Sequence, residues 1–518
     1  LTGMLTVFIY AKLWRRSNVM TDVEFYEIRY SGKTAAFLRG FRALYLGIFF
    51  NIMIMAMVSL AAIKIGGVML NLSPLQSILI ASIVTAIYSA LGGLFGILLT
   101  DFVQFLIAMA GAIVAAVIAV HHPDVGSLHH LLTHPNVAGR LNIFPAFDMS
   151  TKQSVELLLS VFIIPIAVQW WSVWYPGAEP GGGGYMVQRM LAAKNERHAT
   201  GATLFFNVMH YALRPWPWII VALCSLIVFP DLAALHAAFP NVDPKIVRND
   251  LAYPAMLSFL PTGILGIVIA SLISAYMSTI STHLNWGSSY VVNDFYKRFI
   301  NPDAPEKKLV LVGRISTVLM MAGAAIMALM LNNALQGFQI LLAIGAGTGL
   351  LFILRWFWWR INAACEITAM IVSFLIAVYF QFAHSKMFPD IPLESWESLC
   401  IGVAITTLSW IIVAIITKPT ETKKMRDFCR LVNPGGPGWK KVVEDAQKDN
   451  DPIVSEHKAS NLPLGILCMF IGTIAVYSAL FATGFWIYSN TTPAIVLSVV
   501  AVAAGIFLIV FWDKANAN

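Results

Sequence analysis

The sequence predicts an all-α polytopic membrane protein, and three observations lead to that prediction. Of its 518 residues, 58% are hydrophobic and only 12% are charged, whereas a soluble domain carries about 25% charged residues. The mean hydropathy of +0.73 is correspondingly high. Apolar stretches recur along the whole chain, and most approach the roughly 20 residues that a transmembrane helix needs.

The first apolar stretch is too short to cross a bilayer on its own. It runs from Leu1 to Leu13 and ends at the charged sequence Trp14-Arg15-Arg16. A signal peptide would carry its charges before the apolar residues, not after them. We therefore expect residues 1–13 to be the second half of a transmembrane helix, in a chain that is truncated at its N-terminus.

Twelve further apolar segments are each predicted to span the membrane. In chain order they are Ala36–Leu70, Leu75–Gly92, Ile97–His121, Val155–Tyr175, Ala202–Phe229, Pro254–Phe295, Leu309–Leu331, Phe338–Trp359, Ala363–Phe382, Leu399–Ile416, Leu464–Tyr488 and Ala494–Trp512. The first and the sixth exceed the bilayer thickness, so we expect them to tilt or to protrude into the cytoplasm.

The positions of Lys and Arg set the predicted orientation. If the Arg15-Arg16 end is cytoplasmic, most basic residues fall in cytoplasmic loops, as the positive-inside rule requires. The loops expected outside contain only Arg140, Lys152, Lys245, Arg248 and Lys386. This asymmetry accounts for the net charge of +7, so no nucleic-acid partner is implied. Short helices are expected in the outside loops 123–153 and 231–252.

The segment between Pro261 and Asn285 carries hydroxyl groups on one helix face. Ser271, Ser274, Ser278, Ser281 and Asn285 follow one another at spacings of three or four, with Thr279 and Thr282 beside them. Side chains at these spacings share a face, and hydrocarbon cannot solvate them. The face must therefore contact another helix, water or an ion. Oxygen ligands suit hard cations, although small polar residues also mediate helix packing.

Asp101 is the second candidate for an ion site. It lies a few residues into the third span, within Leu98-Leu99-Thr100-Asp101-Phe102-Val103-Gln104. A carboxylate at such a depth is costly and often marks an ion path. It could instead cap the cytoplasmic end of the helix, where Asp is favoured.

Two basic residues also fall within predicted spans. Lys64 lies near the outer end of its span, where we expect its side chain to snorkel towards the interface. Arg214 precedes Pro215 and Pro217, so its segment should be irregular. Either of these two charges could instead pair with an anionic solute.

A further candidate is the aromatic sequence Gln169-Trp170-Trp171-Ser172, which follows Pro165 in the fourth span. A proline within a span frees backbone carbonyls, as in the broken helices that line transporter sites. Aromatic side chains beside such a break could gate a path or stack on a solute. They could equally belong to an interfacial aromatic belt.

Three stretches of the chain resemble signatures of the sodium/solute symporter family, which includes sodium/glucose-type cotransporters. Ala90-Leu91-Gly92-Gly93-Leu94 with Thr100-Asp101 and Gln104 is similar to the family's GGL…TDxxQ signature. Residues Tyr185 to Lys194 resemble its cytoplasmic QRxLAAK stretch. The run Ser278 to Thr282, with Asn285 and the sequence Asp294 to Lys297, resembles its eighth core helix.

The resemblance implies a leucine-transporter-type inverted-repeat core with extra C-terminal helices. Residues 1–13 would be the truncated helix, 14–359 the remaining core, and 360–518 peripheral helices with a cytoplasmic loop at 418–462. By the same resemblance, Ala275, Ser278 and Thr279 would bind a first sodium ion. Asp101, Ser278, Ser281 and Thr282 would bind a possible second one. No other cofactor or metal is implied.

The chain also departs from the family's pattern. The first core helix of the family, which supplies backbone carbonyls to a sodium site, would precede Leu1. An aromatic gate position aligns with Trp171, and a polar residue of the sugar carriers corresponds to Val168 or Gln169. Their seventh-helix lysine falls near Tyr211. With Arg214, the residues Gln169, Trp171 and Tyr211 are therefore candidates for contact with a solute whose identity is open.

These observations predict sodium-coupled symport of a small polar solute, such as a sugar or sugar acid, by alternating access. The protein should be a multi-pass protein of the cell (plasma) inner membrane and not an enzyme, because no nucleophile–base pair or metal-ligand spacing lies in the spans. Two alternatives remain: proton-coupled symport through Asp101, and a solute sensor of the same fold without transport.

Overall fold

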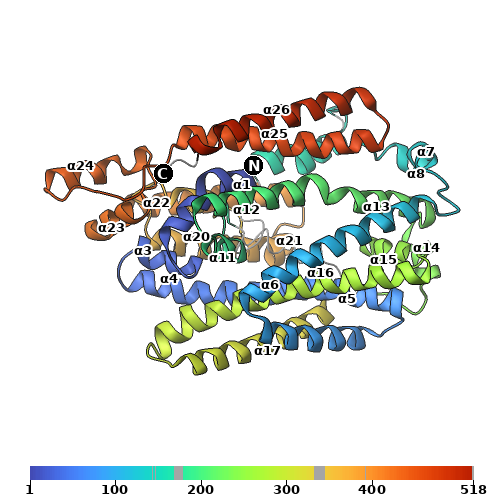
Figure 1. The fold of residues 1–518 in the computed structure, drawn as a ribbon, viewed down its shortest axis with the longest axis horizontal. Helices are drawn as coiled ribbons and strands as arrows, with labels where there is room; N and C mark the ends of the chain where they lie inside the picture. Colours follow the sequence, from blue (N-terminus) through green and yellow to red (C-terminus); the bar gives the residue numbers. More distant parts are fainter. Residues whose placement is uncertain (143, 146, 169–178, 332–344, 391, 516–518) are drawn as a thin grey trace.

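The computed structural model describes residues 1–142, 144–145, 147–168, 179–331, 345–390 and 392–515, which contain helices and no strand. Figure 1 shows the long helices running roughly along the longest axis of the molecule. Helices α23 (Thr422–Val432) and α24 (Lys440–Lys448) lie at one end, and α7 (Leu128–Thr133) and α14 (Leu232–Ala238) at the other. The predicted cytoplasmic and outside loops thus lie at opposite ends.

Nine of the twelve predicted spans correspond to helices that are long and apolar enough to cross a membrane. Within the described residues these are Gly32–Leu70, Leu98–Val120, Glu196–Val228, Thr262–Ile300, Glu306–Met330, Ala363–Met387, Ser395–Ile416, Leu462–Ile487 and Thr491–Ala515. The first and the fourth have 39 residues each, about 58 Å of helix at 1.5 Å per residue. The prediction that these two exceed the bilayer thickness is therefore confirmed.

The two spans predicted between Leu75 and His121 fall within one continuous run of helical residues, and both ends of this run, at Ile78 and at Ala115 and Ala119, pack in the same core cluster. The structure has one helix there, α6 (Pro74–Val120, 47 residues). It begins at a capping box, in which the Ser73 hydroxyl accepts from the Gln76 backbone N–H and the Gln76 side chain accepts from the Ser73 N–H. Only Leu98–Val120 reaches the length of a span, and Pro74–Ile87 is a shorter apolar helix.

Two other predicted spans lie partly outside the described residues. For the span at 155–175 the structure describes α9 (Lys152–Leu158), the π-helical turn η4 (Leu159–Ile163) and α10 (Ile164–Ala167). For the span at 338–359 it describes α19 (Gly349–Leu354).

The apolar stretch at the N-terminus is helical and lies inside the molecule. Helix α1 (Thr2–Leu5), the π-helical turn η1 (Thr6–Tyr10) and α2 (Ala11–Ser17) follow one another without a break. The side chains of Tyr10 and Trp14 are fully buried. This segment packs against α12 (Glu196–Val208) and α25 (Leu462–Ile487), so it forms part of the helix bundle.

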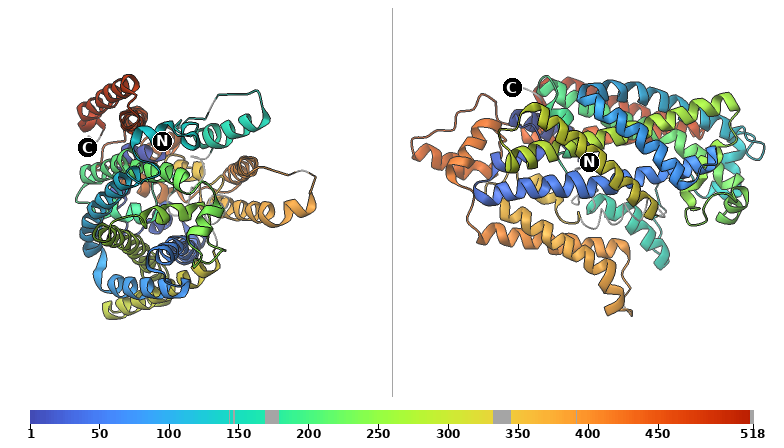
Figure 2. Two further views of the ribbon diagram at one scale, coloured as in Figure 1. Left: turned by 90° about the vertical axis from the view of Figure 1, so that its right-hand side faces the viewer. Right: turned by 90° about the horizontal axis from the view of Figure 1, so that it is seen from below.

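The remaining helices complete the bundle and its periphery. Helices α4 (Gly32–Leu44) and α5 (Asn51–Leu70) form the first long span, with α13 (Pro215–Val228), α16 (Thr262–Ser289) and α17 (Glu306–Met330) beside it. Figure 2 shows two helix pairs on the outside of the bundle. These are α20 (Ala363–Val378) with α22 (Ser395–Ile416), and α25 with α26 (Thr491–Ala515).

The loops predicted outside carry short helices, as expected, and they bind Lys64. The helices include α7, α8 (Pro135–Ala138), α14 and the 3₁₀ turn η7 (Asn249–Leu251). The Lys64 Nζ donates to both carboxylate oxygens of Asp250 at 2.6 Å, and Lys64 is only 3% exposed. The expectation that Lys64 snorkels to the interface is therefore wrong, because a loop carboxylate reaches down to neutralise it.

Buried charged residues join the helices at the cytoplasmic end. The Arg42 Nη2 lies 2.5 Å from Glu179 Oε1. The Tyr30 hydroxyl donates to Glu366 Oε1 at 2.7 Å, and Arg355 Nη1 lies 3.5 Å from the same oxygen. Glu366 has no exposed surface. Burial of a charge in this way is tolerated only when it is paired.

We therefore expect Glu366→Gln to destabilise the protein by about 3–5 kcal/mol, because it leaves the buried guanidinium of Arg355 without its carboxylate partner. Thermal unfolding in detergent measures this change. The control is Glu444→Gln, which breaks an exposed pair with Lys440 and should cost less than about 1 kcal/mol. Equal stability of the two variants would show that the buried pair contributes nothing.

Candidate functional site

The hydroxyl face of α16 divides into two groups in the structure. Three hydroxyls donate to carbonyls of their own helix: Ser271 to Val268 (2.8 Å), Thr279 to Ala275 (2.9 Å) and Ser281 to Ser278 (3.1 Å). By contrast, Ser278 and Thr282 bond to side chains of other helices. Only the second group builds a site between elements.

The carboxylate of Asp101, on α6, is the centre of that site. The Ser278 hydroxyl donates to Asp101 Oδ1. On the other side, Arg189 Nη2 donates to Asp101 Oδ2 at 3.0 Å and to Thr282 Oγ1 at 3.0 Å. The side chains of Asp101 and Arg189 are 23% and 27% exposed, so both are mostly buried. Asp101 therefore faces the hydroxyl groups of α16.

Arg189 comes from α11 (Gly184–Leu191), a short helix that follows a glycine-rich loop. A neighbouring bond holds the same two helices together, because Gln188 Nε2 donates to Asn285 Oδ1 at 3.1 Å. Arg189 Nη1 also donates to the carbonyl of Tyr185 at 3.2 Å. Helix α11 thus docks on α16 through two consecutive polar side chains.

A cavity of about 190 Å³ extends from Asp101 between α6, α13 and α16. The predicted residues Ala275, Ser278 and Thr279 line it together with Asp101. Gln104 lines it as well, and the buried Gln104 Oε1 has no hydrogen-bond partner within the described part of the chain. The cavity wall therefore offers carboxylate, hydroxyl and amide oxygens, which are suitable ligands for a hard cation.

Thr282 and Ser281, both predicted for the second sodium site, differ in their relation to Asp101. Thr282 is linked to Asp101 through Arg189. Ser281 has no exposed surface, and its hydroxyl donates within α16; it is not among the residues that line this cavity.

The predicted solute contacts fall on two cavities. Arg214 lines the cavity that contains Asp101. Tyr211 lines a separate cavity of about 120 Å³, together with Thr6 and Asn207. Gln169 and Trp171 lie outside the described residues.

Arg214 has an unusual environment for a charged residue within a span. Its Nη1 lies 3.2 Å from His210 Nδ1, and its guanidinium carbon lies 4.7 Å from the ring centroid of Trp218. No carboxylate forms an ion pair with it among the residues that the structure describes. Because charges in a span are normally paired, Arg214 can receive an anionic group.

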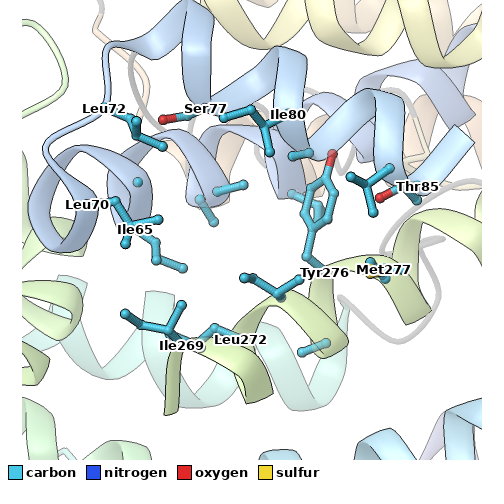
Figure 3. Close-up of a pocket in the computed structure, with 18 of the residues that line it drawn as sticks. Ile65, Leu70, Leu72, Ser77, Ile80, Thr85, Ile269, Leu272, Tyr276 and Met277 are labelled. Atoms are coloured by element: carbon cyan, nitrogen blue, oxygen red, sulfur yellow. The ribbon is translucent and has the colours of Figure 1, made fainter. Parts of the chain in front are cut away.

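A second cavity, on α16 between α5 and α6, is apolar. It has a volume of about 410 Å³ (Figure 3). Figure 3 shows Ile65, Leu72 and Ile80 on one side and Ile269 and Leu272 on the other. The lining is mostly apolar; among the described residues it includes the hydroxyls of Ser77, Thr85, Tyr276 and Thr279 but no carboxylate that could neutralise an ion. The cavity that contains Asp101 is therefore the candidate ion site.

The sequence analysis did not identify Arg189 as a site residue. Arg189 lies in the stretch from Tyr185 to Lys194, which was predicted to be cytoplasmic. Helix α11 (Gly184–Leu191) forms in this stretch. Its contact with Asp101 joins residues 88 positions apart, which local spacing cannot predict. The available signal was that Arg189 and Asp101 both lie in stretches that resemble family signatures.

Comparisons with known proteins show which transporters the chain is similar to. The sodium/glucose cotransporter of Vibrio parahaemolyticus is 27% identical over 402 residues, which cover 76% of this chain and 72% of that protein. Sodium/myo-inositol cotransporter 2 of Homo sapiens is 28% identical over 374 residues, which cover 65% of this chain and 53% of that protein. The chain thus spans about half the length of this second relative.

A solved structure shows the fold. The substrate-bound, outward-open Na⁺-coupled sialic acid symporter superposes with a TM-score of 0.62 at 20% identity, over 81% of this chain and 83% of that one. This likeness confirms the predicted leucine-transporter-type architecture. The model of the sodium:solute symporter family matches residues 1–373, and the chain therefore belongs to this family of transporters.

Proposed function

We propose that the protein couples the inward movement of sodium to the uptake of a small polar solute, by alternating access, in the plasma (inner) membrane. The observation that carries the proposal is the set of oxygens around Asp101, which faces a cavity inside the helix bundle. Sodium entry supplies about 2.3 kcal/mol per charge for each 100 mV of membrane potential. Coupling requires that ion and solute favour the same conformation.

In this proposal the first sodium ion is bound by the Ala275 carbonyl and the hydroxyls of Ser278 and Thr279. A second ion uses Asp101, Ser278, Ser281 and Thr282. The first group is supported by the shared cavity lining. The Thr279 hydroxyl donates to the Ala275 carbonyl, so the hydroxyl oxygen keeps its lone pairs for a cation. The second group is supported by the bond between Ser278 and Asp101.

For the solute we propose contact with Arg214, with Tyr211, which lines the separate cavity of about 120 Å³, and with Gln169 and Trp171, which lie outside the described residues. Arg214 favours a solute with an anionic group, such as a sugar acid, because its charge lacks a carboxylate partner among the described residues. The transport core in this scheme comprises residues 14–359 after the helix at 1–13, and residues 360–518 are peripheral, with the cytoplasmic loop at 418–462.

Proton-coupled transport is the second candidate, and the carboxylate of Asp101 on the cavity wall is the observation that favours it. The two candidates differ in a direct test with proteoliposomes. Solute uptake that needs a sodium gradient supports sodium symport. Uptake that ignores sodium and collapses with a protonophore supports proton coupling instead.

The double substitution Ser278→Ala with Thr279→Val should abolish or strongly weaken the sodium dependence of uptake, because it removes two hydroxyl ligands. The expected rise in the sodium concentration for half-maximal uptake is at least about tenfold, which corresponds to about 1.4 kcal/mol. The control is Ser288→Ala on the same helix, whose hydroxyl bonds to Gly313 instead. Unchanged sodium dependence in the double variant would refute the site.

Arg214→Gln should raise the half-saturating concentration of an anionic solute while the sodium concentration for half-maximal uptake stays the same. Arg214→Lys keeps the charge and should retain part of the affinity. The measurement is competition of uptake by matched solutes with and without a carboxylate. If the wild-type protein does not prefer the carboxylate form, Arg214 does not select the solute.

A further inference from the structure

Arg189 Nη2 occupies a position where a cation ligand set is already assembled. It lies 3.0 Å from Asp101 Oδ2 and 3.0 Å from Thr282 Oγ1. These two oxygens come from α6 and α16, and both belong to the proposed second sodium site. A guanidinium has five donors and no acceptor, so it satisfies the oxygens as a metal cation would.

Arg189 and a sodium ion cannot use these oxygens at the same time. Both would need to lie between Asp101 and Thr282, and their like charges would repel at such a short distance. The side chains of Asp101 and Arg189 are mostly buried, so solvent screens this repulsion only in part. Binding of sodium in this position therefore requires the guanidinium to leave.

The connection of α11 to the rest of the protein determines what moves with Arg189. The loop before α11 has backbone φ angles of +89° at Gly181, +92° at Gly182 and +54° at Gly184, which glycine adopts without strain. The Gly184 N–H donates to Asp22 at 2.7 Å, and the Trp14 indole donates to the Gly181 carbonyl at 2.9 Å. Helix α11 is thus attached to the cytoplasmic end of the bundle.

We propose that Arg189 is a tethered cation that fills the Asp101–Thr282 site when no sodium is bound there, and that sodium displaces it. This inference rests on the proposed function and adds a regulatory residue to the second site. Displacement removes the Arg189 contacts that dock α11 on α16 and leaves the bond between Gln188 and Asn285 and the ring contacts of Tyr185. Occupation of the ion site is thereby coupled to the position of a cytoplasmic helix.

The coupling must act in both directions. If sodium weakens the docking of α11, then docking of α11 weakens sodium binding by the same factor. Removal of the arginine should therefore increase the affinity for sodium, although it removes a charged residue that forms hydrogen bonds. A residue with only a structural role would have the opposite effect or none.

The test is Arg189→Gln in the full chain, reconstituted in proteoliposomes. We expect the sodium concentration for half-maximal uptake to fall by about tenfold, within the range of about 5- to 150-fold for coupled sites. Arg189→Lys keeps a competing cation, so its sodium concentration for half-maximal uptake should lie between those of the wild type and the glutamine variant. Lys194→Gln removes an exposed charge just after α11 and should leave the sodium affinity unchanged.

A second measurement does not depend on transport. Sodium that binds only the folded protein raises its melting temperature, so the sodium concentration that stabilises the detergent-solubilised protein should fall in Arg189→Gln. Asp101→Asn should weaken sodium binding, and in that background Arg189→Gln should have little further effect. A double-mutant cycle of the two substitutions measures their coupling. Strong coupling would show that Arg189 and sodium compete for Asp101.

The possible results separate this inference from the proposed function. If the wild-type protein shows no sodium dependence, the proposed function fails. If the wild type depends on sodium and Asp101→Asn weakens that dependence, but Arg189→Gln leaves the sodium affinity unchanged or lowers it, only the role of Arg189 is overturned.

Discussion

The carboxylate of Asp101 is the interaction on which the candidate site depends. A charge within a span must be neutralised or hydrated, because hydrocarbon offers neither counter-ion nor water. Here a hydroxyl of α16 and a guanidinium of α11 bind its two oxygens, so three helices meet at one side chain. At this point a carboxylate, a guanidinium and two hydroxyls meet beside a cavity. No other contact described among these three helices combines such groups.

The hydroxyl face of α16 shows why packing and ion binding could not be separated from spacing alone. Ser271 and Ser281 are buried and bond to carbonyls of their own helix, as expected for small residues at helix contacts. Ser278 and Thr282 lie on the same face but bond to Asp101 and Arg189. Helix packing therefore explains Ser271 and Ser281, whereas Ser278 and Thr282 belong to the candidate ion site. Contacts with other helices, which spacing does not show, distinguish the two groups.

Hydropathy predicted nine spans correctly because each is an apolar helix, and a helix forms all its backbone hydrogen bonds within the same segment. Features that depend on distant partners could not be predicted. The partner of Lys64 comes from a loop 186 residues away. Tyr211 and Arg214 are three residues apart and would share a face of a regular helix. They line different cavities because the π-helical turn η6 (Met209–Leu213) interrupts the regular geometry between them.

The cytoplasmic charge network gives the Asp101 site a mechanical connection to the end of the bundle. Glu179 lies at the start of the loop that leads to α11, and Arg42 of α4 binds it in a buried ion pair. The loop after Glu179 bonds to Trp14 and Asp22. A change at Asp101 that releases α11 therefore acts on a short segment whose other end is fixed. If Arg189 and sodium compete for Asp101 as we propose, rearrangement of this cytoplasmic anchor alters the cation affinity at Asp101, because binding and conformation are linked reciprocally.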